Sequence, residues 1–294
     1  MSKTLITGAT GGLGSAVVKF LSQNSTSDLA VMVRDTSTEK AQAFAKQGIE
    51  VRKGDYDDEV SLIGAFEGID TLYFVSGSDI GARLQQHQNV VEASSEAGVN
   101  HIVYTSAGRK NEGEDSPLYP VMQALISTEN WIKASGMNYT ILQHNLYAGV
   151  VPMFVGEKAQ LLNSKTVYLP TGEGKTAFAL RDELAEAGAN VLSSIDQHVN
   201  KTYVLNGQAA VSFAEIASML SDILDEKIGY HSPSVPEFQE TMKSIGLPEE
   251  IIGMTVGFSL GIAAGEFDDE GKDLQTLLGR EPMKLASFLQ QVYG

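Results

Sequence analysis

The chain has 294 residues, a formal net charge of −16 and no cysteine. The lack of cysteine excludes disulfides, thiolate metal ligands and cysteine nucleophiles. The acidic balance argues against binding of a nucleic-acid backbone. With 43% hydrophobic residues, the chain can build a full core, as two domains or one large α/β domain. The amino-terminal segment has no signal-peptide layout, and the apolar stretch 251–264 is short and interrupted by glycine. We therefore expect a cytoplasmic protein without a membrane span.

Over the first half of the chain, apolar runs of strand length alternate with amphipathic segments. Thr36 and Glu39 have capping-box spacing ahead of the second helix, and Gly48 follows that helix as a stop. Strands are expected at residues 3–7, 29–33, 49–51, 70–75, 101–105 and 139–142. Near-continuous apolar strands in alternation with helices predict an α/β fold with a Rossmann-type, doubly wound parallel sheet.

The pattern changes after residue 150. A helix is expected at 182–192, a seventh strand at 201–205, and mostly helical structure at 235–265. Ser212 and Glu215 form a capping box for a helix that runs through Leu224. We expect residues 1–150 to form an NAD(P)-binding domain. Residues 151–294 would form a smaller, mostly helical substrate-binding region that covers the carboxyl edge of the same sheet and is not an independent domain.

Three glycines stand between the first strand and the first helix, in LITGATGGLG. Gly8 permits a tight turn, Gly11 lets backbone amides approach a pyrophosphate, and Gly14 lets the helix pack close to the sheet. An anion would then lie at the amino terminus of the helix. At the first strand–helix junction of a doubly wound sheet, this spacing favours dinucleotide binding; a purely structural turn is the alternative.

The ribose of a dinucleotide is recognised near the end of the second strand, where this chain has Arg34 followed by Asp35. An arginine suits the 2′-phosphate of NADPH, whereas an aspartate would hold the 2′-hydroxyl of NADH. We expect Arg34 to point over the adenosine and Asp35 to begin the turn into the second helix. NADPH is therefore the expected cofactor, with NADH less favoured. Asp55 and Tyr56, after the third strand, lie where the adenine is expected, although Tyr56 could equally be ordinary edge packing.

The chain resembles the NmrA-like group of atypical short-chain dehydrogenase/reductases. Within it, the chain is most similar to the branch of type 2 NAD(P)H:quinone oxidoreductases and triphenylmethane reductases. The segments that carry the resemblance are TGATGGLG, VRD, GDYDD, QHQNVVEASSEAGVNHIVYTSA, STENWIKASGMNYTILQ and DLQTLLGREPMKL. It implies NADPH binding and flavin-independent reduction of quinones or cationic dyes. The superfamily also contains redox sensors, so a non-catalytic NADP(H)-binding regulator is the alternative.

The resemblance assigns roles residue by residue. For the cofactor it implies Gly8, Thr10, Gly11, Gly12 and Leu13 in the phosphate loop, Arg34 at the 2′-phosphate, Asp55 and Tyr56 at the adenine, Ser76 and Gly77 at the ribose and nicotinamide side, and Thr105 and Ser106 near the nicotinamide. For the substrate it implies Tyr147. Gln143 and Asn145 could also hydrogen-bond a quinone oxygen, and the pKa range of His144 suits proton donation. A loop histidine that bonds backbone is the alternative for His144.

Two features of the substrate side depart from the family pattern. Relatives carry histidine or lysine where this chain has Leu125, and they read L-R-N or L-R-P where it has Leu142, Gln143 and His144. The chain also lacks the Tyr-x-x-x-Lys pair that donates a proton in many nicotinamide-dependent reductases. In YPVMQ the lysine position is occupied by Gln123. Because Pro120 suits a first helical position, Tyr119 is expected at the cap, outside the helix.

The absence of the Tyr-x-x-x-Lys pair indicates which kind of substrate accepts the hydride. Hydride addition to a ketone leaves an alkoxide that needs a positioned proton donor, whereas addition to a quinone leaves a much less basic phenolate, and a cationic dye becomes neutral. We therefore expect a reductase that transfers hydride from NADPH directly to a quinone or a similar conjugated small molecule. No catalytic residue is certain; His144 and Tyr147 are the candidates. The histidines show no metal-ligand spacing, and the sequence does not predict the oligomeric state.

Overall fold

The computed structural model describes residues 2–24 and 28–294. The chain divides into two compact units. Unit 1 contains residues 1–107, 121–143 and 181–204, and unit 2 contains residues 108–120, 144–180 and 205–294. The units are interleaved along the chain, whereas the boundary expected near residue 150 is a single cut. Residues 181–204 belong to unit 1 because they supply its last helix and the last strand of its sheet.

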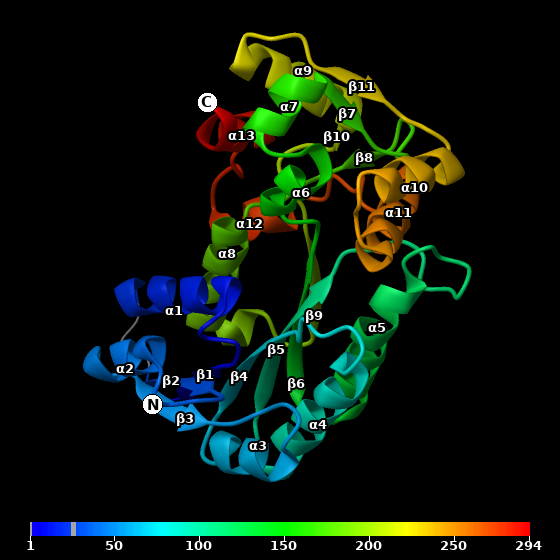
Figure 1. Cartoon of the computed structure of the whole chain (residues 1–294). Helices are drawn as coiled ribbons and strands as arrows, with labels where there is room; N and C mark the ends of the chain where they lie inside the picture. Colours follow the sequence, from blue (N-terminus) through cyan, green and yellow to red (C-terminus); the bar gives the residue numbers. More distant parts are fainter. Residues whose placement is uncertain (1, 25–27) are drawn as a thin grey trace. The chain divides into compact units, whose positions relative to one another are not determined.

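Unit 1 is built on a seven-stranded sheet with the strand order β3-β2-β1-β4-β5-β6-β9 (Figure 1). Neighbouring strands from β3 to β5 run parallel. The strands are β1 (Lys3–Ile6), β2 (Asp28–Val33), β3 (Glu50–Lys53), β4 (Thr71–Val75), β5 (His101–Ala107), β6 (Asn138–His144) and β9 (Lys201–Leu205). The order reverses between β1 and β4, which is where ligands of doubly wound sheets bind. The predicted fold class and the seventh strand are confirmed.

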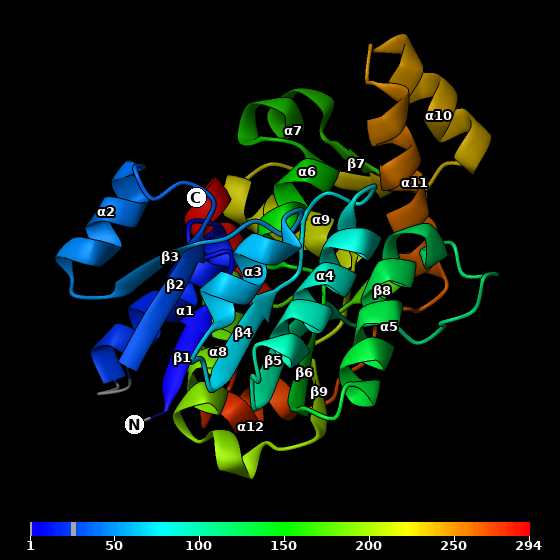
Figure 2. The ribbon, with the colours of Figure 1, turned by 90° about the horizontal axis from the view of Figure 1, so that it is seen from below.

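Helices cover both faces of this sheet. The helices are α1 (Gly12–Asn24), α2 (Glu39–Lys46), α3 (Glu59–Phe66), α4 (Arg83–Glu96), α5 (Tyr119–Ala134), α8 (Arg181–Ser193) and the 3₁₀ turn η2 (Ile195–Gln197). Helices α1 and α8 pack against each other on one face, and α3, α4 and α5 line the other (Figure 2). Because both faces are covered, strand residues such as Leu5, Leu72 and Ile102 are fully buried.

Two helix starts differ from the sequence-based expectation. Thr38, rather than Thr36, caps α2: its hydroxyl accepts a hydrogen bond from Ala41 N. The chain before it is a turn held by Asp35, so the helix begins at Glu39. Helix α5 begins at Tyr119. The expectation that Tyr119 lies outside the helix is therefore wrong by one residue.

Unit 2 combines helices with two small two-stranded sheets, β7–β11 (parallel) and β8–β10 (antiparallel). The strands are β7 (Thr166–Tyr168), β8 (Lys175–Thr176), β10 (Val211–Ser212) and β11 (Gly229–His231). The helical elements are η1 (Ala148–Val150), α6 (Val151–Val155), α7 (Lys158–Ser164), α9 (Phe213–Leu224), α10 (Val235–Ser244), α11 (Glu249–Ala263), α12 (Asp273–Leu278) and α13 (Leu285–Tyr293). The predicted capping box of Ser212 and Glu215 opens α9.

None of the helices in the described part of the chain combines the length and apolar character that a bilayer crossing requires.

Candidate functional site

The glycine-rich loop between β1 and α1 forms a cradle that side chains would fill. Gly8 has a φ of +59°, in the left-handed region that favours glycine. A Cβ on Gly14 would lie 2.4 Å from the carbonyl oxygen of Gly8, so only glycine fits there. The loop ends at the amino terminus of the 13-residue helix α1. This arrangement suits an anion, because helix amino termini present unpaired N–H groups and a positive dipole end.

A cleft of about 460 Å³ opens over this loop within unit 1. Every residue predicted to bind the cofactor lines it in the described structure, except Thr105 and Ser106. The lining residues are Gly8, Thr10, Gly11, Gly12, Leu13, Gly14, Met32, Val33, Arg34, Gly54, Asp55, Tyr56, Asp57, Val75, Ser76, Gly77, Ser78, Asp79 and Gln86. The cleft therefore runs from the phosphate loop past the ends of β2, β3 and β4, which is the path that an extended dinucleotide needs.

Arg34 and Asp35, adjacent in sequence, have different roles. Arg34 is exposed and lines the cleft. The Asp35 carboxylate accepts hydrogen bonds from the hydroxyl and the backbone N–H of Ser37, at 2.6 and 2.8 Å. These bonds lower the pKa of Asp35. Since the turn before α2 engages this carboxylate, Arg34 rather than Asp35 is the charged group that lines the cleft at the end of β2.

Two further cations, neither of which was predicted from the sequence, lie beside the loop. The Lys40 ammonium, on α2, donates a hydrogen bond of 2.7 Å to the carbonyl oxygen of Thr10. The Arg181 guanidinium, at the start of α8, is so close to Gly12 that a Cβ there would lie 2.9 Å from its Nη1. Together with Arg34 they surround the loop with positive charge in a strongly acidic protein. The cradle and its cations fit a dinucleotide carrying several phosphates.

Tyr56 lines the cleft, and its hydroxyl also links the backbone segments beneath the cleft. Its hydroxyl lies 2.5 Å from Thr7 Oγ1 and 2.8 Å from the carbonyl oxygen of Val75. The ring packs edge-on against Phe74. Burial raises the pKa of Tyr56, which therefore stays protonated. This hydroxyl therefore ties the loop after β3 to the ends of β1 and β4.

Gly77 is held by two side chains of α4. Its N–H donates to His87 Nε2 at 2.8 Å, and its carbonyl accepts from Arg83 Nε at 2.7 Å. Since Nε2 accepts, the neutral His87 ring carries its proton on Nδ1, which donates to Thr128 Oγ1 at 2.9 Å. Burial, assisted by the nearby Arg83 charge, lowers the pKa of His87 to about 3. The peptide groups of Gly77 are thus fixed by the protein, and the cleft is lined there by the glycine itself.

A buried carboxylate lies behind the end of β5. Ser106 Oγ donates a hydrogen bond of 2.5 Å to Glu129 Oε1, and the Glu129 side chain is only 3% exposed. The amide of Gln143 donates to both carboxylate oxygens, at 3.1 and 3.2 Å. Lys133 Nζ lies 3.8 Å from Oε2. Gln143, predicted to contact the substrate, therefore directs its amide at Glu129, a residue the sequence analysis had given no role.

In unit 2, His144 and Tyr147 form a pair whose His144 Nδ1 and Tyr147 hydroxyl lie 3.0 Å apart. Burial lowers the pKa of His144 to about 3. The ring is therefore neutral near pH 7, outside the range that the sequence analysis expected for a proton donor. The Asn145 amide donates to Asn206 Oδ1 and to the carbonyl oxygen of Phe267, at 2.8 and 3.0 Å. Its amide hydrogens thus hold unit 2 together.

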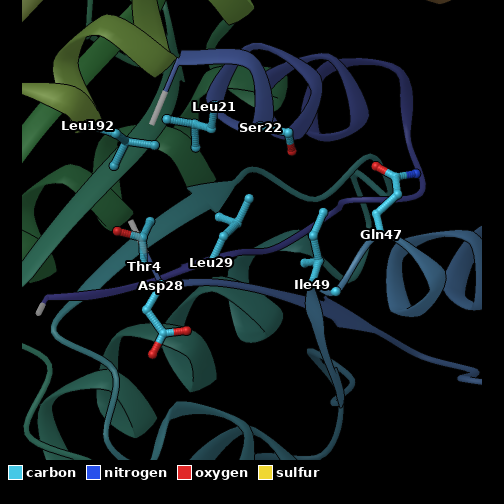
Figure 3. A pocket seen from close by; sticks show the side chains of 9 residues that line it. Thr4, Leu21, Ser22, Asp28, Leu29, Gln47, Ile49 and Leu192 are labelled. Carbon is cyan, nitrogen blue, oxygen red and sulfur yellow. The ribbon is translucent and has the colours of Figure 1, made fainter. Parts of the chain in front are cut away.

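A second pocket, of about 250 Å³, lies at the opposite, amino-terminal edge of the unit 1 sheet (Figure 3). It is lined by Thr4, Leu21, Ser22, Asp28, Leu29, Gln47, Gly48, Ile49 and Leu192. Two of its polar side chains have protein partners: Ser22 Oγ donates to Val18 O at 2.8 Å, and Asp28 Oδ2 lies 3.4 Å from Lys3 Nζ. The described residues that line this pocket form no glycine cradle and include no cation. The cleft at the carboxyl edge is therefore the candidate site.

Comparison with known proteins identifies the family to which the chain belongs. The model of the NmrA-like family matches residues 1–289. Quinone oxidoreductase 2 of Escherichia coli is 34% identical over 290 residues, which cover 98% of each chain. The crystal structure of that NADPH-dependent enzyme in complex with NADPH has a TM-score of 0.89 and covers 99% of this chain and 100% of its own.

A second solved structure is that of the Citrobacter sp. triphenylmethane reductase in complex with NADP(H). It is 34% identical, has a TM-score of 0.86, and covers 99% of this chain and 100% of its own. The chain described here belongs to the NmrA-like family, as the motifs of the sequence indicated.

Proposed function

We propose that this NmrA-like protein transfers hydride from NADPH directly to a quinone or a similar conjugated acceptor. It is an NAD(P)H-dependent oxidoreductase, the class of its quinone-reducing and dye-reducing relatives. The observation that carries the proposal is the cleft of unit 1. There, a glycine cradle that admits no side chain at Gly14 adjoins Arg34, Lys40 and Arg181.

In this proposal, NADPH would be held through its phosphates, and once bound it would supply the hydride. The backbone of the loop and the α1 amino terminus bind the pyrophosphate. Arg34 and Lys40 distinguish NADPH from NADH by pairing with the 2′-phosphate. The fixed Gly77 segment and Thr105, whose hydroxyl accepts a hydrogen bond from Ser76 N at 3.0 Å, give the far end of the cleft a rigid wall, and rigid placement is what hydride transfer chiefly requires.

The proposed acceptor follows from the groups that unit 2 provides. His144 is neutral, and Tyr147 is a weak acid. Tyr147 has Val151, not a lysine, four residues after it, so it lacks the partner that accompanies a donor tyrosine in reductases that protonate a strongly basic alkoxide. A phenolate-like product or a neutralised cation makes a smaller demand. Within this proposal, Tyr147, oriented by His144, hydrogen-bonds an acceptor oxygen. The flat, conjugated acceptor class is preferred to simple ketones for that reason.

The test is to follow NADPH oxidation by its near-ultraviolet absorbance, with benzoquinones, naphthoquinones and cationic triarylmethyl dyes as acceptors. Saturable oxidation above a no-protein blank supports the proposal. NADPH binding in the same sample with no oxidation across the panel would contradict it, and would favour the alternative of a redox sensor that binds NADP(H) without turnover.

A further inference from the structure

Three aspartates line the cleft of unit 1, and their carboxylates have different partners. Asp55 Oδ1 accepts the backbone N–H of Asp57 at 3.2 Å. Asp79 Oδ1 accepts two backbone N–H groups of the turn before α4, at 3.0 and 3.3 Å. These two carboxylates therefore hold the turns in which they lie. The Asp57 carboxylate is bonded instead by a side chain of another element, because Gln86 Nε2, on α4, donates to both of its oxygens at 3.1 Å.

The Asp57–Gln86 bridge joins two walls of the cleft. Asp57 follows β3, and Gln86 lies on the helix that follows β4. In the sheet, β2 and β1 stand between β3 and β4. The bridge therefore connects the two walls across the ends of the strands that they flank. Both residues line the cleft, and neither was predicted from the sequence to bind the cofactor.

Helix α4 fixes both members of the bridge. Asn89, one turn after Gln86, donates an amide hydrogen bond of 2.9 Å to the carbonyl oxygen of Tyr56, the residue before Asp57. The oxygen of the Gln86 amide faces Gly77, where a Cβ would lie 3.0 Å from it. The amide nitrogen is thus directed at Asp57, and the carboxylate keeps a defined position in the cleft.

A carboxylate beside a carboxamide offers groups that complement the edge of a purine. The two carboxylate oxygens of Asp57 together offer about four acceptor positions, so they can accept a further donor while Gln86 is bound. The Gln86 amide has a second N–H as well. Adenine presents an exocyclic amino group beside ring nitrogens that accept, and carboxylates and carboxamides are side chains that recognise such edges.

We propose that Asp57, oriented by Gln86, selects the adenine of the cofactor by accepting a hydrogen bond from its exocyclic amino group; this rests on the function proposed above. The position fits, because Arg34 ends β2, where the ribose is recognised, and Asp57 follows the neighbouring edge strand β3. The family resemblance assigns Asp55 to the adenine. Asp57 is the more exposed of the two carboxylates and is not engaged by its own turn as Asp55 is.

The competing interpretation is that the bridge only keeps the two walls together. A purely structural bridge would matter equally for every nucleotide that fills the cleft. A carboxylate that recognises the base would distinguish adenine from hypoxanthine, in which a carbonyl oxygen replaces the amino group. There the carboxylate would face an acceptor in place of a donor, which disfavours the analogue.

The experiment compares two nucleotides that differ only in the base. Isothermal titration calorimetry measures the dissociation constants of NADPH and of reduced nicotinamide hypoxanthine dinucleotide phosphate. We expect the wild type to bind NADPH about tenfold more tightly or better, since a hydrogen bond to a charged group is lost with the analogue. In D57A and D57N this ratio should fall toward one, chiefly through weaker binding of NADPH. Q86A should lose part of the preference, because the carboxylate is no longer oriented.

The matched controls come from a second amide–carboxylate pair of α4. Gln88 Nε2 donates to Glu92 Oε1 at 2.8 Å, and neither residue is among the described residues that line the cleft. Q88A and E92Q should therefore keep the wild-type ratio. D55N should weaken binding of both nucleotides alike, because its turn loses a contact. Melting temperatures without nucleotide report folding, and the nearly isosteric D57N decides if D57A does not fold.

Equal affinities of the wild type for the two nucleotides would overturn the selection of adenine by Asp57. Equal losses for both nucleotides in the Asp57 variants and Q86A would show a structural bridge and overturn it as well, as would an unchanged ratio in those variants. Each of these results leaves the proposed reductase function intact. A wild-type protein that binds neither nucleotide would instead contradict the proposed function, and the selection of adenine with it.

Discussion

Arg83 and His87, four residues apart on α4, hold opposite polar groups of Gly77: Arg83 binds its carbonyl oxygen and His87 its N–H. Both side chains are at least nine-tenths buried. The wall of the cleft is therefore set by a helix face rather than by the loop itself.

Removal of His87 should weaken nucleotide binding. In H87A the N–H of Gly77 loses its acceptor, and a buried group left unpaired costs about 1–3 kcal/mol. We expect a lower melting temperature and a several-fold higher dissociation constant for NADPH, measured by quenching of protein fluorescence. H101A is the matched control, because His101 is also buried but bonds Thr140, away from the cleft. A variant H87A that binds NADPH as the wild type does would contradict the role of this contact.

The cofactor preference should depend on the cations and not on the aspartate. R34A should raise the dissociation constant of NADPH about tenfold or more, since a charge-assisted bond to phosphate is lost, and leave that of NADH nearly unchanged. K40A should act in the same direction. D35N should have little effect, because Asp35 serves the turn. K46A, at the far end of α2, is the control. Equal losses for both nucleotides in R34A would rule out a 2′-phosphate role.

Two glycine substitutions should have opposite effects. G14A places a Cβ 2.4 Å from a backbone oxygen, so we expect loss of NADPH binding and a marked fall in melting temperature. A Cβ at Gly64, inside α3, meets nothing within 4 Å. G64A should be neutral or stabilise by up to about 1 kcal/mol, because alanine favours a helix. Thermal unfolding with and without NADPH measures both, and a tolerated G14A would refute the packing argument.

On acidification, the protein should begin to lose stability at pH values well above the folded-state pKa values of its buried histidines. Burial lowers the pKa of His87 and His144 to about 3 and that of His101 to about 4, from 6.5. Unfolding lets these rings bind protons, so their stabilising contribution is present above pH 6.5 and is lost as the pH falls toward 4. At pH 5 the loss is roughly 2 kcal/mol for each ring.

Urea unfolding at pH 7.5 and pH 5 measures this dependence. The variant H101Q, which cannot titrate at that position, should show a smaller difference between the two pH values than the wild type. A free energy of unfolding that does not change between these pH values would mean that the rings are not held in their neutral form.

The sequence alone predicted the structural role of a residue where that role depends on the residue's own backbone or on its near neighbours in the chain. The loop of Gly8, Gly11 and Gly14, the capping box at Ser212 and the assignment of Asp35 to a turn are local patterns. The roles of Gln143 and Asn145 were different, because the partners of their amides, Glu129 and Asn206, are 14 and 61 residues away.

The same reason explains the cations that were missed. Lys40 reaches Thr10 across 30 residues, and Arg181 meets Gly12 only because α8 packs on α1. Such contacts are set by tertiary packing, which single-sequence patterns do not encode. The bond between His87 and Gly77 depends on tertiary packing in the same way.

Deuterium labelling is the decisive test of direct hydride transfer from NADPH to the acceptor. NADPH deuterated at either face of C4 is reacted, in separate samples, with a cationic triarylmethyl dye and the purified protein, and the reduced dye is analysed by mass spectrometry. Direct transfer predicts deuterium on the central carbon of the dye from one of the two labelled cofactors. Reduced dye without deuterium from either cofactor would contradict direct transfer.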